Sequence, residues 1–135
     1  MALDSAPIIY YLEGHPRYGS RFAPLIAAAE DGRVRVIVSA ITLAEVVAGP
    51  IAAGNEVLAA RYRDALCESP GWRLVSIDAD VAVLAARLRA RHRLRLPDSI
   101  QLATALAAGA SAFVTHDKAF ARVRDLPVLG LDDAG

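Results

Sequence analysis

The sequence predicts an α/β fold: a three-layer α/β/α sandwich around a central, mainly parallel sheet of about four or five strands. Two observations predict it. Short runs of β-branched and apolar residues alternate along the chain with longer segments of helical spacing. The clearest of these runs are almost continuously apolar, which is typical of strands that are covered on both faces. Because alternating strands and helices favour parallel pairing, we expect helices on both sides of the sheet.

Three segments are the clearest strand candidates, and two more are weaker. The clear candidates are VRVIVSA (34–40), WRLVSI (72–77) and AFVTH (112–116). The weaker candidates are MAL (1–3) at the N-terminus and PVLGL (127–131) near the C-terminus. Together they give the expected four or five strands.

Five segments between the strands have helical spacing, and several end at a glycine. Gly32, Gly49 and Gly109 are placed as C-terminal stops, because glycine readily adopts the left-handed conformation that often follows a helix. The segments are SRFAPLIAAAEDG (20–32), TLAEVVAGP (42–50), GNEVLAARYRDALCES (54–69), DADVAVLAARLRARH (78–92) and PDSIQLATALAAG (97–109).

Length and composition indicate one domain spanning residues 1–135. An apolar share of 55% is enough for a sizeable core, and no apolar run is long enough to cross a membrane. Together with an acidic residue at position 4, before any basic leader, this predicts a cytoplasmic protein. Cys67 is the only cysteine, which excludes an internal disulfide and a thiolate metal cluster. Fifteen basic residues balance fifteen acidic ones, so net charge indicates no partner.

Four acidic residues are placed to meet at one edge of the predicted sheet. Asp4 closes the first strand, and Asp117 follows strand 112–116. Glu45 lies about one turn into the helix after strand 34–40, and Asp98 opens the helix that leads back to the sheet. Ligands of open parallel sheets bind outside the carboxyl ends of the strands. We therefore expect the four carboxylates to converge there.

Each acid also has a local explanation as a helix cap. Thr42 with Glu45, and Asp98 with Gln101, fit the capping-box pattern, in which a cap residue is answered three positions later by Glu or Gln. The other two acids are each able to cap a short turn that follows them. Caps do not explain why all four acids share one edge of the sheet.

Convergence of four carboxylates favours a divalent cation. Without a cation, their mutual repulsion raises one or more pKa values. Oxygen ligands without accompanying cysteine or histidine clusters suit Mg²⁺ or Mn²⁺. Such ions activate water and stabilise leaving oxygens in phosphoryl transfer. This pattern favours an enzyme of phosphoryl transfer.

Basic residues cluster just before Asp98. All but one of the basic residues are arginine, and RLRARHRLRL places Arg91, Arg93 and Arg95 next to the predicted acidic site. Arginine suits bidentate contacts with phosphate, so these three residues are candidates for a basic rim that binds the phosphate groups of a substrate. The alternative is a solvated helix face. His116 precedes Asp117 and is a weaker candidate for substrate contact.

Several segments resemble the PIN domain, specifically the VapC-like toxins of bacterial toxin–antitoxin pairs. They are LDSAPIIYYLEGHP, VSAITLAEVVAGP and RLPDSIQLATALAAGASAFVTHDKAF, in this order. The resemblance implies that the acidic quartet is Asp4, Glu45, Asp98 and Asp117. It also implies that Ser5 and Thr115 support these acids without binding the metal themselves.

The resemblance further implies a Mg²⁺- or Mn²⁺-dependent endoribonuclease, usually a homodimer, that a cognate antitoxin protein holds inactive. A different class of function fits the same residues: a catalytically weak or silent PIN-like module that binds another protein, with the acids acting as caps.

Overall fold

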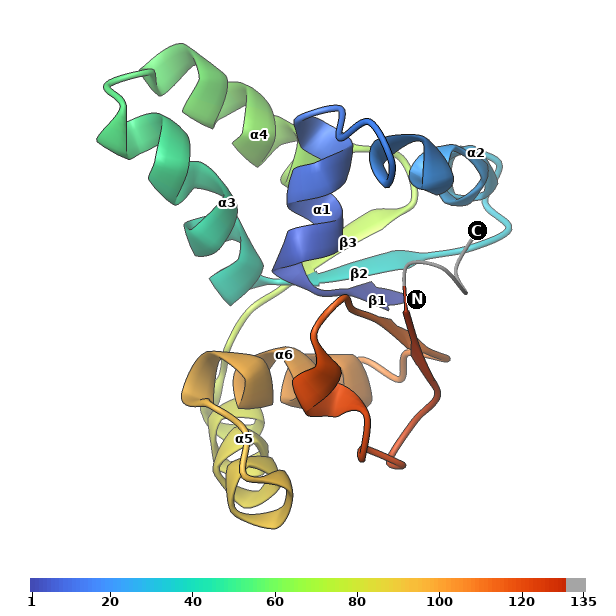
Figure 1. Cartoon of the computed structure of the whole chain (residues 1–135), viewed down its shortest axis with the longest axis vertical. Coiled ribbons are helices and arrows are strands. Elements are labelled where there is room, and N and C mark those ends of the chain that lie inside the picture. The colour runs from blue at the N-terminus through green and yellow to red at the C-terminus, as the bar shows by residue number, and fades with distance from the viewer. Residues whose placement is uncertain (131–135) are drawn as a thin grey trace.

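The computed structural model describes residues 1–130 and has a five-stranded, fully parallel sheet at its centre (Figure 1). Its strand order is β3-β2-β1-β4-β5, so the N-terminal strand lies in the middle. Every predicted strand is present but shorter than expected, and position 131 of the last candidate lies outside the described residues. The strands are β1 (Ala2–Leu3), β2 (Val36–Ser39), β3 (Trp72–Val75), β4 (Phe113–Val114) and β5 (Val128–Leu129).

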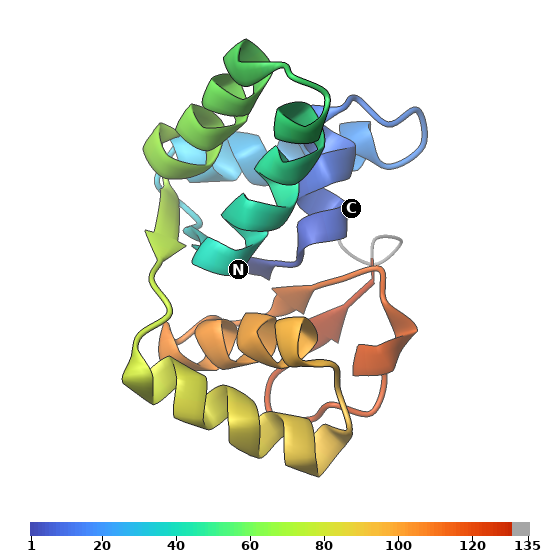
Figure 2. The ribbon, with the colours of Figure 1, turned by 90° about the vertical axis from the view of Figure 1, so that its left-hand side faces the viewer.

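Helices cover both faces of the sheet, which confirms the α/β/α sandwich (Figures 1 and 2). Alternating side chains of each strand enter two separate cores. Ala2 and Phe113 belong to the core with α5 and α6, whereas Leu3 and Val114 belong to the core on the opposite face. The helices are α1 (Ser5–Leu12), α2 (Ala23–Glu30), α3 (Ala40–Ala52), α4 (Glu56–Glu68), α5 (Ala79–His92) and α6 (Leu96–Ala107).

The N-terminal part of the helical layer differs from the sequence prediction. Residues after Asp4 form the two-turn helix α1, where we expected only a turn. The segment predicted as one helix over 20–32 is a 3₁₀ turn, η1 (Gly19–Phe22), followed by α2. Gly32 follows α2, as predicted, and has a positive φ.

Helix α3 begins earlier and ends later than predicted. Its N-cap is Ser39, whose hydroxyl accepts a hydrogen bond from the Ile41 N–H, so the expected capping box at Thr42 is wrong. The strand ends at Ser39, and the chain turns into the helix immediately. Gly49 does not stop the helix, which continues through Pro50 to Ala52. A proline this close to the C-terminus removes one hydrogen bond without breaking the helix.

Helix α6 also begins earlier than predicted. Its N-cap is Arg95, which makes no side-chain capping bond, and Pro97 lies in the first turn. Asp98 is therefore the third helical residue and not the cap, so the capping box of Asp98 with Gln101 is wrong as well. The helix ends before Gly109, as predicted. None of the helices within residues 1–130 combines the length and the apolar character that a membrane span needs.

Candidate active site

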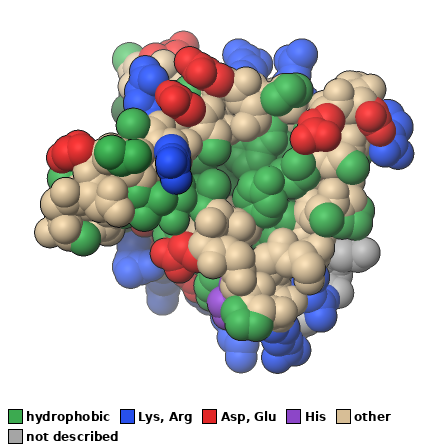
Figure 3. Space-filling model, turned by 90° about the horizontal axis from the view of Figure 1, so that it is seen from above, with side chains coloured by type: hydrophobic (Ala, Val, Ile, Leu, Met, Phe, Trp, Pro, Cys, Tyr) green, Lys and Arg blue, Asp and Glu red, His purple; other side chains and the backbone are tan. Residues whose placement is uncertain are grey.

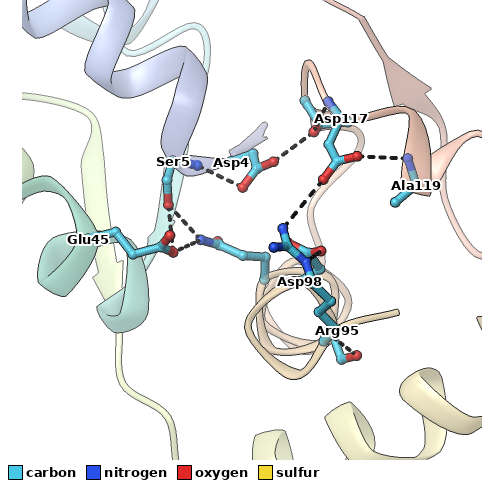
Figure 4. Close-up of polar contacts among 10 residues, drawn as sticks. Asp4, Ser5, Glu45, Arg95, Asp98, Asp117 and Ala119 are labelled. Carbon is cyan, nitrogen blue, oxygen red and sulfur yellow. Dashed lines mark hydrogen bonds and ion pairs between the residues drawn. The ribbon is translucent and has the colours of Figure 1, made fainter. Parts of the chain in front are cut away.

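Four acidic side chains lie at the carboxyl edge of the sheet, each on a different segment (Figure 4). Asp4 and Asp117 follow the adjacent parallel strands β1 and β4. Glu45 lies in α3, which follows β2, and Asp98 lies in the first turn of α6. The edge-of-sheet argument from the sequence thus places these residues correctly. They form the acidic site, the name used below for this set of four.

Asp4 is the most constrained of the four acids. Only 8% of the residue is exposed, and its Oδ1 accepts a 2.8 Å hydrogen bond from the Ser5 N–H, which caps α1. Its Oδ2 accepts a 2.7 Å hydrogen bond from the Thr115 hydroxyl. Burial raises the pKa of Asp4, the hydrogen bonds from Thr115 and Ser5 lower it, and the nearby charges of Asp98 and Glu45 raise it. The carboxylates of Asp98 and Glu45 are therefore close enough to repel that of Asp4.

Asp98 is the third residue of α6 and pairs with the arginine at the N-cap of the same helix. It is 8% exposed, and its Oδ2 accepts a 3.2 Å hydrogen bond from Arg95 Nε. The same guanidinium reaches toward the next acid, with Arg95 Nη2 3.9 Å from Asp117 Oδ2. Arg95 is largely exposed, so this contact is weakened by solvent. A cationic group thus lies between two of the four acids.

One carboxylate oxygen of Asp117 makes a structural contact, and the other lies toward Arg95. Its Oδ1 accepts a 2.8 Å hydrogen bond from the Ala119 N–H and caps the short 3₁₀ helix η2 (Lys118–Phe120). Its own N–H donates to the Thr115 hydroxyl oxygen at 3.0 Å. The capping expectation for this acid is confirmed, and its other oxygen faces Arg95 (Figure 4).

Glu45 is exposed, but one of its carboxylate oxygens contacts buried polar side chains. The Ser5 hydroxyl donates a 3.0 Å hydrogen bond to Glu45 Oε1. Gln101 Nε2 lies 3.5 Å from the same oxygen and donates to the hydroxyl oxygens of Ser5 and Thr42. The sequence interpretation missed Gln101 and Thr42 as parts of the site. A signal was present, because residues three apart on a helix share a face, so Gln101 lies on the face of Asp98.

The other basic candidates and His116 do not contact the acidic site in residues 1–130. Arg91, in the last turn of α5, pairs through Nη1 with Asp125 Oδ2 at 2.9 Å. Arg93 ends that helix with a φ of 56°. His116 is exposed and packs its ring against Tyr18 at 5.0 Å, on the other side of β4 from Thr115. Of the three candidate rim arginines, Arg95 is the one that reaches the acids.

The donor set suits a hard divalent cation, although within residues 1–130 no three His, Cys, Asp or Glu side chains are grouped closely enough to hold a metal ion. Two observations support the fit. The pKa of Asp4 is raised in part by its acidic neighbours, a repulsion that a cation would relieve. In addition, Asp98 and Asp117 already share the positive charge of Arg95. Carboxylate oxygens are the ligands that Mg²⁺ and Mn²⁺ prefer.

Comparison with solved structures finds chains of similar fold. The fold is similar to a toxin–antitoxin complex from Klebsiella pneumoniae (TM-score 0.73, 26% identity, 96% of both chains). It is also similar to VapBC2 from Rickettsia felis bound to a DNA fragment from its promoter (TM-score 0.74, 19% identity, 96% of both chains). A third similar fold is VapC20 from Mycobacterium tuberculosis, a toxin that cleaves the sarcin–ricin loop (TM-score 0.69, 16% identity, 89% of this chain and 92% of that one).

Sequence comparison gives the family directly. No curated protein matches this chain significantly in sequence. The family profile described as the PIN domain, however, matches residues 1–126, which is nearly the whole chain. The chain therefore belongs to the PIN-domain family.

Proposed function

We propose that this chain is a metal-dependent endoribonuclease and the toxin of a toxin–antitoxin pair. The observation that carries the proposal is the acidic site, where carboxylates from four separate segments lie at one edge of the sheet. Burial raises the pKa of Asp4, and the nearby charges of Asp98 and Glu45 raise it further. Membership of the PIN-domain family supports it. The similar fold of VapC20, described as a toxin that cleaves the sarcin–ricin loop, supports RNA as the class of substrate.

The four acids and their hydrogen-bond partners would have different roles at the acidic site. Asp4 and Asp98 are buried and are our first choice as ligands of Mg²⁺ or Mn²⁺. Glu45 and Asp117 either complete the coordination or orient the attacking water. A bound ion would supply activation of that water and neutralisation of phosphate charge. Ser5 and Thr115 hold the acids through hydrogen bonds without binding the ion themselves.

RNA binding requires positive charge around this negative site. Arg91, Arg93 and Arg95 remain the proposed rim, and all three are exposed. Each arginine that contacts phosphate releases counterions from RNA, so binding depends on salt. Replacing one of them with alanine is expected to weaken binding to all RNA sequences alike and to flatten its salt dependence.

The helical layer of α1–α4 supports a protein partner, which we propose is the cognate antitoxin. Hydrophobic side chains gather in a hollow of this layer (Figure 3). Between α3 and α4 an apolar groove is lined by Leu43, Val47, Ile51, Ala59 and Ala60, with Glu56 and Arg63 at its rim. Similar folds were solved as toxin–antitoxin complexes. We also propose that the chain is a homodimer and acts in the cytoplasm.

One feature favours the alternative of a PIN-like protein-binding module without catalysis. Arg95 and the helix caps give Asp4, Asp98 and Asp117 partners without any metal ion. A comparison of wild type with Asp98→Asn separates the two functions. Because Asp98 is not the cap of α6, its replacement leaves the helix start intact.

The experiment is thermal unfolding against Mn²⁺ concentration. A ligand that binds only the folded state raises stability by RT ln(1 + [L]/Kd). Wild type is expected to gain stability in a saturable way, and Asp98→Asn to gain little. Asp78→Asn is a matched control, because Asp78 caps α5 away from the site and asparagine caps equally well. An equal response of all three proteins, or of none, would contradict the proposal.

A further inference from the structure

A cluster of buried polar side chains contacts Glu45. It consists of Ser5, Thr42 and Gln101, which are 6%, 0% and 2% exposed. The three residues come from α1, α3 and α6, so the cluster joins three helices at the acidic site. Gln101 is central, because its Nε2 donates to both hydroxyl oxygens and lies 3.5 Å from Glu45 Oε1.

Packing alone does not account for this cluster. A carboxamide in the interior costs free energy unless its hydrogen bonds are satisfied, and an apolar side chain fills such a space without that requirement. Gln101 nevertheless lies on the face of α6 that carries Asp98. It donates to the Ser5 hydroxyl, which in turn bonds to Glu45, and to the Thr42 hydroxyl, which bonds to Ser5. Glu45 is exposed and has a long side chain, which would otherwise adopt several rotamers.

We propose that Gln101 is a positioning residue, whose carboxamide fixes the side chain of Glu45 toward a divalent cation at the acidic site, both directly and through the Ser5 hydroxyl, which Thr42 also contacts. This inference rests on the proposed function. It parallels the role of Thr115, which holds Asp4 in the same site. Groups that orient metal ligands by hydrogen bonding commonly affect metal affinity about 10–100-fold.

The test is a double-mutant cycle measured by Mn²⁺ calorimetry, which does not depend on RNA cleavage. Gln101→Met keeps the length and volume of the side chain and removes the donors. It is expected to raise the Mn²⁺ Kd about 10-fold in the wild-type background. In the Glu45→Gln background it is expected to change the Kd little, because its effect passes through Glu45.

A matched control separates positioning from stability. Thr104→Val lies one turn further along α6 and, like Gln101→Met, removes a buried polar group. The group removed is a hydroxyl that bonds to Ile100 O and lies 3.3 Å from the Ser39 hydroxyl. It is expected to lower the unfolding free energy without changing the Mn²⁺ Kd. If Gln101→Met does not fold, Thr42→Val removes one acceptor of the same cluster and is expected to weaken Mn²⁺ binding in the same direction.

The failing outcomes are distinct. Mn²⁺ binding by wild type with an unchanged Kd in Gln101→Met would overturn the positioning role and leave the proposed function intact. The same holds if Gln101→Met weakens binding equally with and without Glu45→Gln, or if Glu45→Gln has no effect. A wild-type protein that does not bind Mn²⁺ would overturn the proposed function, and the positioning role with it.

Discussion

The Thr115 hydroxyl donates a 2.7 Å hydrogen bond to Asp4 Oδ2 and accepts one of 3.0 Å from the Asp117 N–H. Thr115 is 3% exposed and directly follows β4, next to the end of β1. One buried hydroxyl group therefore fixes the side chain of one acid and the backbone of another. The positions of two of the four acids therefore depend on the uncharged side chain of Thr115.

Replacing Thr115 with valine keeps the shape of the side chain and removes the hydroxyl group. Because the hydrogen bond lowers the pKa of Asp4, that pKa is expected to rise further in Thr115→Val. Protons then compete better with the metal, so we expect Mn²⁺ to bind roughly 10-fold more weakly, with a larger loss at lower pH. Calorimetry at several pH values measures this. Thr115→Ser retains the hydroxyl group and is expected to behave as wild type; equal affinity of the valine variant would contradict the prediction.

The raised pKa of Asp4 also predicts how stability changes with pH. The folded state binds the Asp4 proton more tightly than the unfolded state does, mainly because the carboxyl group is buried. Its contribution to stability is therefore fully present below the unfolded pKa and is lost as the pH rises through the folded pKa. Asp4→Asn is expected to remove this contribution. Urea unfolding at acidic and neutral pH should show a smaller loss of stability with rising pH in the variant than in wild type. An identical pH dependence of stability in Asp4→Asn and wild type would refute this prediction.

The sheet and the place of the acids were predictable from the sequence because both follow from alternation. Strands that alternate with helices pair in parallel, and their carboxyl ends share one edge. The predicted capping boxes failed because a four-residue pattern does not reveal where a strand ends. β2 ends at Ser39, so α3 begins before Thr42. The contacts of Gln101 were hidden for a related reason, since its partner Ser5 lies 96 positions away in the chain.

The turn before β3 provides a test of the fold that does not involve the acidic site. Gly71 has a φ of +79°, and a Cβ there would overlap the carbonyl group of Ala29 at the end of α2. Gly54 has a φ of +74° but faces open space. Gly54→Ala is expected to cost about 1 kcal/mol from backbone strain. Gly71→Ala adds a steric overlap and is expected to cost about 3 kcal/mol. Urea unfolding of both variants measures the difference, and equal losses would contradict the close packing of α2 on this turn.

The contact of Arg95 with Asp98 and Asp117 predicts competition between this arginine and a metal ion. Arg95 Nε is 3.2 Å from Asp98 Oδ2, so a cation that binds Asp98 through this oxygen competes with the guanidinium group. We expect Arg95→Gln to bind Mn²⁺ more tightly than wild type, because no positively charged group then competes with the ion for Asp98.

Arg91→Gln is the matched control: Arg91 is also exposed and paired, but its partner is Asp125. Its Mn²⁺ affinity is expected to equal that of wild type. Calorimetry at low salt gives the largest difference, because salt screens the exposed guanidinium. Weaker Mn²⁺ binding by Arg95→Gln would show instead that Arg95 helps to arrange the acids for the metal.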